Sequence, residues 1–121
     1  MKQILLLEEV AQCLLPLLLL YYINDIHISW WLWIILFFSP DIGMLGYIIN
    51  PKIGAISYNI FHHKAIAILL FVMVFFIDNR INDYLAISGL LLYAHASFDR
   101  VFGYGLKHTD SFKNTHLGKL K

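Results

Sequence analysis

Histidine and aspartate residues occur in this chain in a combination that suits a divalent metal ion. His95 and Asp99 are four residues apart, so on a helix they share one face and can reach one ligand together. Imidazole with carboxylate is the ligand mix of zinc and of non-haem divalent ions, and a catalytic zinc site keeps three protein ligands and one open position. The sequence predicts His62, His95 and either Asp99 or Asp41 as ligands, with His116 as a closing ligand.

The chemistry of such a site would be hydrolytic. A bound divalent ion lowers the pKa of its water and polarises the oxygen of an ester or phosphoester. Glu8 could serve as the general base, or it could orient a metal-binding imidazole through a hydrogen bond to the second ring nitrogen. We therefore assign Glu8, Asp41 and Asp99 to catalysis. No HExxH motif or similar fixed spacing is present, so the prediction depends on where the helices place these residues.

Four apolar stretches must position these residues, and each is close to the length that crosses a bilayer. They span residues 4–22, 28–49, 53–77 and 84–106. A hydrocarbon core of roughly 30 Å needs about 20 helical residues. Hydrophobic residues make up 60% of the chain and charged residues 14%, whereas soluble domains carry roughly 25% charged residues. We expect an all-α fold, a four-helix transmembrane bundle over residues 1–106, and an extended or loosely folded polar tail over 107–121.

The distribution of positive charge predicts the orientation. The connections are short, so neighbouring helices run antiparallel and both termini share one side. That side, with the turn at 50–52, carries Lys2, Lys52, Arg100, Lys107, Lys113, Lys119 and Lys121, while the other side carries Arg80 alone. By the positive-inside rule both termini are cytoplasmic. The chain is expected to be a multi-pass protein of the cytoplasmic (inner) membrane.

Depth in the membrane brings the ionisable residues together. Glu8 falls near the inner end of the first helix, and Asp41 falls in the inner half of the second. His62 is nine residues into the third helix, ~13 Å at helical rise. His95 and Asp99 fall in the inner half of the fourth. Four helices thus supply acids or imidazoles to one layer, which predicts a polar pocket open to the cytoplasm.

A helix break is expected beside this pocket. Pro40 lacks a backbone donor, and Gly43 and Gly46 loosen the following turns. Broken helices at membrane depth are tolerated where they are buried or line a wet cavity. Asp41 would then line the pocket together with backbone groups that the break leaves free.

Structural roles remain open for the same residues. Asp99 and Arg100 could form an ion pair, or Arg100 could extend to the inner interface. His95 could make a hydrogen bond between helices, and Asp41 could cap a helix after the break. His116, on a polar tail, could be an ordinary surface histidine.

Some classes of partner are excluded by composition. The net charge is +1 and no basic stripe with interleaved aromatic residues occurs, so nucleic acid is not an expected partner. The single cysteine, Cys13, excludes a disulfide framework.

The lipid bilayer is the expected environment, and a lipid-like molecule is the expected substrate. Because four short helices enclose little volume, a homodimer is an alternative to a monomeric site.

Four blocks of sequence resemble a bacterial membrane family named domain of unknown function 4260. They are residues 39–47, 54–62, 95–107 and 112–118, which correspond to the family patterns Pro-Asp-x-Ser-Met-Leu-Gly-Tyr, Tyr-Asn-x-x-His, His-x-x-x-Asp-Arg-x-x-Gly-Tyr-Gly-Leu-Lys and Thr-His-Leu-Gly. The similarity extends over nearly the whole chain. Gly43 replaces the usual serine, Asn50 a usual glycine and His108 a usual tyrosine.

The resemblance implies a set of functional positions but no activity. It marks Glu8, Asp41, Tyr58, Asn59, His62, His95, Asp99, Arg100, Tyr104, Lys107 and His116. It thereby favours His62 over His63 and Glu8 over Glu9.

Two hypotheses of function follow. In the first, the protein is a divalent-metal-dependent hydrolase that cleaves a membrane-embedded ester or phosphoester in the cytoplasmic half of the bilayer. In the second, it is a non-enzymatic transport, proton-handling or scaffold subunit in which the same residues form polar pairs between helices.

Overall fold

The computed structural model describes residues 1–23, 25–77 and 81–120, and this part of the chain is mostly helical. In chain order its elements are α1 (Lys2–Ile23), α2 (Trp30–Phe38), the 3-10 helix η1 (Ser39–Ile48), α3 (Pro51–His62), α4 (Lys64–Val72), the 3-10 helix η2 (Met73–Phe75), α5 (Ile81–Val101), β1 (Asn114–Thr115) and β2 (Gly118–Lys119). The expected helical fold is confirmed at this level. Residues 78–80 of the predicted connection at 78–83 and two charges of the orientation argument, Arg80 and Lys121, lie outside the described residues.

Two helical segments among the described residues are long and apolar enough to cross a membrane. They are Lys2–Ile23 and Trp30–Ile48. A third span exists if Pro51–His62 and Lys64–Phe75 count as one bent segment. Helix α5 does not belong to this set, because its ends carry polar and charged residues such as Asp83, Asp99 and Arg100.

The third predicted helix is broken and bent by 45° between α3 and α4. His63 is the break: its backbone is extended, with φ −89° and ψ 117°, and its Nδ1 accepts a hydrogen bond from the Ala65 N–H. The side chain therefore caps α4 at the residue where α3 ends. Hydropathy alone predicted one straight span here, because a single histidine at the break does not interrupt the apolar pattern.

The second predicted helix changes character at Pro40. The α-helix ends at Phe38, and a 3-10 helix continues to Ile48. This segment packs tightly on α3, where a Cβ on Gly43 would lie 2.8 Å from the Ser57 carbonyl oxygen. The Ser57 hydroxyl donates to the Gly43 carbonyl at 2.5 Å. Where a helix break was expected from Pro40 and the following glycines, the helix therefore changes from α to 3-10 without interruption, and α3 holds this segment in place.

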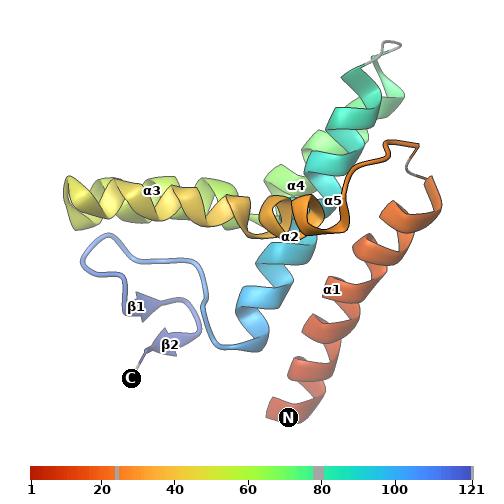
Figure 1. Cartoon of the computed structure of the whole chain (residues 1–121). Coiled ribbons are helices and arrows are strands. Elements are labelled where there is room, and N and C mark those ends of the chain that lie inside the picture. Colours follow the sequence, from red (N-terminus) through yellow and green to blue (C-terminus); the bar gives the residue numbers. More distant parts are fainter. Residues whose placement is uncertain (24, 78–80, 121) are drawn as a thin grey trace.

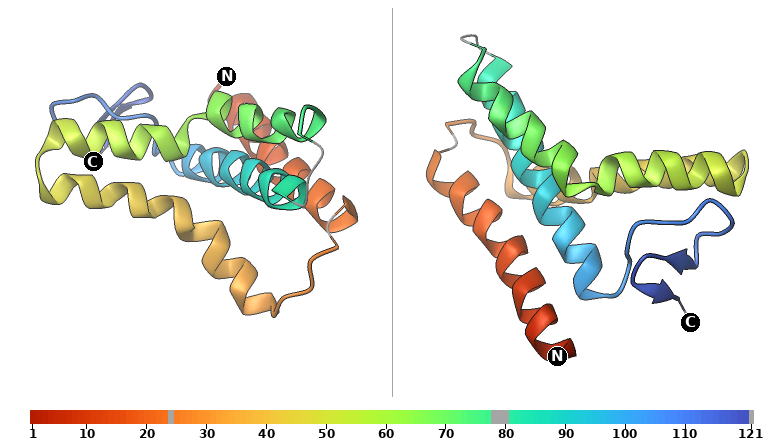
Figure 2. Two further views of the ribbon diagram at one scale, coloured as in Figure 1. Left: turned by 90° about the horizontal axis from the view of Figure 1, so that it is seen from above. Right: turned by 180° about the vertical axis from the view of Figure 1, so that it is seen from behind.

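The helices form two groups that cross, unlike four parallel rods. Helices α1 and α4 pack along α5, while η1 and α3 form a hairpin that runs across them (Figure 1). Figure 2 shows this hairpin projecting from the group of α1, α4 and α5 in both views. The N-terminus and the C-terminal strands lie toward the same end of the molecule (Figure 1).

Polar side chains tie α1, α4 and α5 together within the apolar group. The Lys64 ammonium donates to Glu9 at 2.7 Å and to Gln12 at 2.5 Å, and the Tyr93 hydroxyl donates to the same Gln12 oxygen at 2.9 Å. Small residues allow close approach elsewhere: Gly89 lies against the backbone of α4. These contacts fix α4, and therefore the break at His63, relative to α5.

The tail beyond α5 is folded, which corrects the expectation of an extended or loose segment. Strands β1 and β2 form an antiparallel hairpin, and Lys107 forms a β-bridge with Thr115. The Asn59 side chain on α3 donates to the Lys107 carbonyl at 2.8 Å and accepts from the Lys107 N–H at 2.7 Å. These two hydrogen bonds of one asparagine anchor the tail to α3. Hydropathy patterns do not reveal such an anchor.

Candidate metal centre

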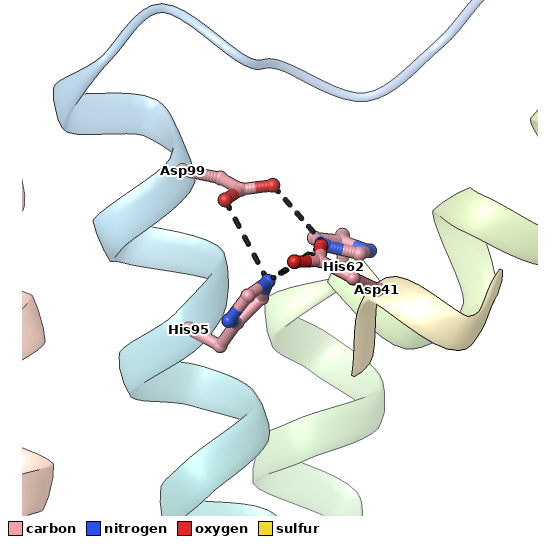
Figure 3. A group of neighbouring side chains, drawn as sticks. All are labelled: Asp41, His62, His95 and Asp99. Atoms are coloured by element: carbon pink, nitrogen blue, oxygen red, sulfur yellow. Dashed lines mark hydrogen bonds and ion pairs between the residues drawn. The ribbon is translucent and has the colours of Figure 1, made fainter. Parts of the chain in front are cut away.

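Four side chains meet where the η1–α3 hairpin crosses α5. Asp41 comes from η1, His62 from the last turn of α3, and His95 and Asp99 from successive turns of α5. One ligand atom from each lies within 4.8 Å of all the others. Figure 3 shows the four groups pointing toward one another from three elements. We call these four residues the His/Asp cluster, a buried group that could hold a metal ion.

The distances inside the His/Asp cluster are those between ligands of one ion. His62 Nε2 lies 3.1 Å from His95 Nε2, 3.3 Å from Asp41 Oδ1 and 3.1 Å from Asp99 Oδ2. His95 Nε2 lies 3.0 Å from Asp41 Oδ1 and 3.6 Å from Asp99 Oδ1. A tetrahedron with bonds of about 2.0–2.1 Å has edges of roughly 3.3–3.4 Å. The contacts among His62, His95 and Asp41 are close to this length, and Asp99 faces the two histidines with different oxygens.

The His62 ring is held in the tautomer that a metal ligand needs. Its Nδ1 lies 2.9 Å from the Tyr58 carbonyl oxygen, and a carbonyl only accepts, so Nδ1 carries the proton. In the neutral ring, Nε2 is then a bare lone pair directed at the His/Asp cluster. This backbone contact through the second nitrogen is the usual support for a metal-binding histidine.

Tyr58 supports two cluster residues at once. Its ring stacks on the His62 imidazole, with centroids 3.8 Å apart and planes 7° apart. Its hydroxyl donates to Asp99 Oδ2 at 2.5 Å. Tyr58 is 1% exposed, so water does not compete for this hydrogen bond. The phenol therefore fixes both the plane of His62 and the rotamer of Asp99.

His95 is enclosed by aromatic rings and is 0% exposed. The ring centroids of Phe37, Phe38 and Phe98 lie 5.4, 6.0 and 6.4 Å from its own. Its Nδ1 is buried with no hydrogen-bond partner among the described residues. Because its surroundings are apolar, His95 makes its polar contacts through Nε2, which faces the His/Asp cluster.

The donor set suits a divalent cation. Each Nε2 of the two imidazoles lies within 3.6 Å of an oxygen of Asp41 and of an oxygen of Asp99. A divalent cation held here would take the imidazole lone pairs as ligands and would neutralise both carboxylates.

Asp41 lies on the accessible side of the His/Asp cluster. Its side chain is 41% exposed, against 2% for His62, 0% for His95 and 14% for Asp99. Three groups are thus enclosed and one faces outward. An outward carboxylate can serve as a fourth ligand or can accept a proton from water beside the other three.

The structure does not bring every predicted residue to the cluster. Glu8 is exposed on α1, while its neighbour Glu9 bonds Lys64. His116 lies in the tail, where its Nδ1 accepts from the Leu106 N–H at 2.8 Å. Burial lowers the pKa of His116. Arg100 makes no ion pair with Asp99 within the described part of the chain, because Asp99 turns toward the histidines.

Lys107 is a second buried group near the cluster, which residue spacing did not single out. Its ammonium lies 4.7 Å from the Tyr58 ring centroid and 4.1 Å from that of Phe112. Its Nζ is buried and lacks a hydrogen-bond partner among the described residues. Burial lowers its pKa to about 8, although the charge of Asp99 opposes the shift. Only the resemblance to a family marked this residue.

Comparison with known proteins agrees with the sequence blocks described above. The model of the family described as Domain of unknown function (DUF4260) matches residues 2–120. No curated protein and no solved structure matches the chain. The match spans all four cluster residues and the tail that packs beside them, and the chain therefore belongs to the DUF4260 family.

Proposed function

We propose that this protein is a divalent-metal-dependent hydrolase that cleaves an ester or phosphoester of a membrane-embedded, lipid-like substrate. The observation that supports this proposal is the convergence of two imidazoles and two carboxylates within 4.8 Å, beside helices apolar enough to cross a membrane. Zinc or a similar ion suits this ligand set. When bound, it would supply an activated water and a Lewis acid.

The roles follow from burial. His62, His95 and Asp99 are the enclosed groups, so we assign them as ligands. Asp41 is the exposed member, so we assign it as the general base that receives a proton from water. Tyr58 keeps Asp99 and His62 in place. Glu8 and His116 lie outside the cluster, and we no longer assign them to the reacting group.

The proposal includes an orientation. With both termini cytoplasmic in a multi-pass protein of the cytoplasmic membrane, the cluster would lie in the cytoplasmic half of the bilayer. Support comes from the charge asymmetry of the sequence and from the N-terminus and C-terminal strands lying toward one end of the molecule (Figure 1). To test this orientation, Cys13 is replaced by serine and a single cysteine is introduced at either terminus. Its accessibility to a membrane-impermeant thiol reagent is then measured in spheroplasts.

Metal content is the first test, and adjacent histidines provide matched variants. His62→Asn removes Nε2 but retains a side-chain amide that can donate to the Tyr58 carbonyl. His63→Asn changes the exposed neighbour and retains a residue that caps helices well. Elemental analysis of protein purified in detergent should give one divalent ion per chain for wild type and His63→Asn, and much less for His62→Asn. Wild-type protein that stays free of metal after incubation with zinc contradicts the proposal.

Hydrolysis is the second test, with Asp41→Asn as the informative variant. This change removes the proposed base while His62, His95 and Asp99 stay in place. Zinc-loaded protein is reconstituted into vesicles of bacterial lipid extract, and mass spectrometry follows the released fatty acids and phosphoesters. Wild type should generate products, and Asp41→Asn should bind zinc but generate about 10²–10⁴-fold less, the usual contribution of a general base.

The non-enzymatic hypothesis predicts a different pair of results. Because His62 and His95 join α3 to α5, the same contacts could support a transport, proton-handling or scaffold role. In that case vesicles containing the wild type should show ion or solute flux that depends on Asp99, with no lipid product. That outcome would exclude the hydrolase while retaining the geometry of the cluster.

A further inference from the structure

An apolar cavity of about 860 Å³ lies beside the His/Asp cluster, between α1, α2 and α5. Its walls include Leu14 and Leu17 of α1, Ile34 and Phe38 of α2, and Leu91 and Phe98 of α5. This volume is in the range of ligand sites, about 300–1,000 Å³. Charged side chains are absent from its lining within the described residues.

The cavity exists because α1 and α2 both rest on α5 but separate from each other. In Figure 1, α1 runs alongside α5 and the short α2 lies across it. Leu91 and Phe98, seven residues apart on α5, form part of the floor between them. At helical rise these two floor residues are ~10 Å apart along the axis.

This floor runs beside the proposed metal ligand His95. His95 stands four residues after Leu91 and three before Phe98, so all three share one face of α5. The rings of Phe37, Phe38 and Phe98 line the cavity and also contact the His95 imidazole. One layer of aromatic rings therefore separates the cavity from His95, which is a proposed ligand.

We propose that this cavity binds one acyl chain of the lipid substrate and holds its scissile ester or phosphoester at the His/Asp cluster. The inference depends on the proposed function for the role of the bound lipid, but the binding itself needs no hydrolysis. It assigns substrate recognition to α1 and α2, of which α2 places Phe37 and Phe38 against His95.

An acyl chain fits this cavity better than a water-soluble ligand does. Both α1 and the α2–η1 segment are apolar enough to span a membrane, so the lining lies at the depth of lipid chains. The polar lining residues include Tyr21 and His27, located where α1 ends and α2 approaches. These two residues lie at the end of the cavity away from the His/Asp cluster. At the other end Phe38 lines the cavity three residues before the exposed Asp41, so a lipid whose acyl chain fills the cavity can present its ester on the accessible side of the cluster.

Adjacent leucines on α1 allow a matched test. Leu14 lines the cavity and Leu15 does not, yet they are 60% and 58% exposed. Full-length protein in detergent micelles is mixed with a phospholipid that carries a diazirine in one acyl chain. After irradiation, mass spectrometry measures the labelled fraction and locates the labelled residues. Unlabelled phospholipid serves as the competitor.

Wild type should label at cavity residues such as Leu17 and Ile34, and the competitor should abolish this labelling. Leu14→Trp fills the cavity and should reduce the labelling about tenfold, whereas Leu15→Trp should leave it unchanged. Equal loss in both variants, or labelling that does not saturate, indicates nonspecific lipid contact and overturns the inference. Cross-linking of two protein copies through this surface, blocked by Leu14→Trp, assigns the cavity to a homodimer and overturns it too.

The same labelling separates this inference from the proposed function. His62→Asn should lose metal but retain saturable labelling in the cavity, because the cavity does not need the ion. If wild-type protein binds the probe but releases no lipid product, the acyl site stands and the hydrolase fails. If lipid product forms without saturable labelling, the hydrolase stands and the acyl site fails.

Discussion

Replacing Tyr58 by phenylalanine should weaken zinc binding by about one to two orders of magnitude while leaving the fold intact. The substitution keeps the ring that stacks on His62 at 3.8 Å. It removes only the hydroxyl that donates to Asp99 Oδ2 at 2.5 Å. Asp99 would then lose the group that fixes its rotamer, and its carboxylate would have to be ordered by the ion itself.

The magnitude follows from the kind of hydrogen bond that is lost. A hydrogen bond to a charged group contributes about 1.5–3 kcal/mol, and each 1.4 kcal/mol is a factor of about ten in a dissociation constant. The expected weakening is therefore roughly 10–150-fold. Substitutions of groups that support metal ligands elsewhere give a similar loss of about 10–100-fold.

The assay is a competition titration of zinc between the detergent-solubilised protein and a chromophoric chelator at neutral pH. Tyr47→Phe provides the control, because the Tyr47 hydroxyl is buried without a hydrogen-bond partner in the described part of the chain. Removing an unpaired hydroxyl should leave zinc affinity within about twofold of wild type. Equal affinity of Tyr58→Phe and wild type would show that Asp99 is not a ligand held by Tyr58.

Three further predictions concern stability. Glu9→Gln should lower the free energy of unfolding by about 1–3 kcal/mol in thermal denaturation, because the Lys64 charge loses its counterion, whereas Glu8→Gln should have almost no effect. Gly89→Ala should cost about 1–3 kcal/mol in the same assay, since its Cβ would lie 2.7 Å from the Ala67 carbonyl oxygen on α4. The Lys107 pKa of about 8 is below its ordinary 10.5, so the folded state releases this proton first, and wild-type stability should rise with pH between about 8 and 10.5 relative to Lys107→Met.

Three results would contradict these predictions. Equal loss of stability in Glu8→Gln and Glu9→Gln would mean that the ion pair with Lys64 does not hold α1. Ser88→Ala, at an exposed neighbouring position of α5, should be near neutral, and a loss equal to that of Gly89→Ala would rule out steric contact with α4. Parallel pH profiles for wild type and Lys107→Met would show that Lys107 is not buried as a cation.

Much of the ligand set was predictable because chemistry and helical periodicity limit the choice. His95 and Asp99 had to share a face once the last apolar stretch was helical. Depth counting placed His62 and Asp41 in the same layer, and the structure brings all four within 4.8 Å. The same counting also selected Glu8, since it gives a height in the membrane but no direction around the helix axis.

Glu9 and Lys64 show where residue types mislead. Neither residue was expected to pair with the other, yet they form an ion pair with N and O 2.7 Å apart that joins α1 to α4. Sequence separation hides this pair, because the two residues are 55 positions apart. A buried charge reveals its partner only when the packing of both helices is known.

The sequence alone determined that helices are apolar enough to cross a membrane, that the helix is disturbed near Pro40, and that imidazoles and carboxylates lie at one level. The tertiary structure decided the rest. The extended backbone at His63 bends the chain by 45°, and the side chain of Asn59 anchors the tail. Both depend on single hydrogen-bonding groups, which hydrophobic periodicity does not detect. The crossing of the η1–α3 hairpin over α5 then sets which of the polar residues meet.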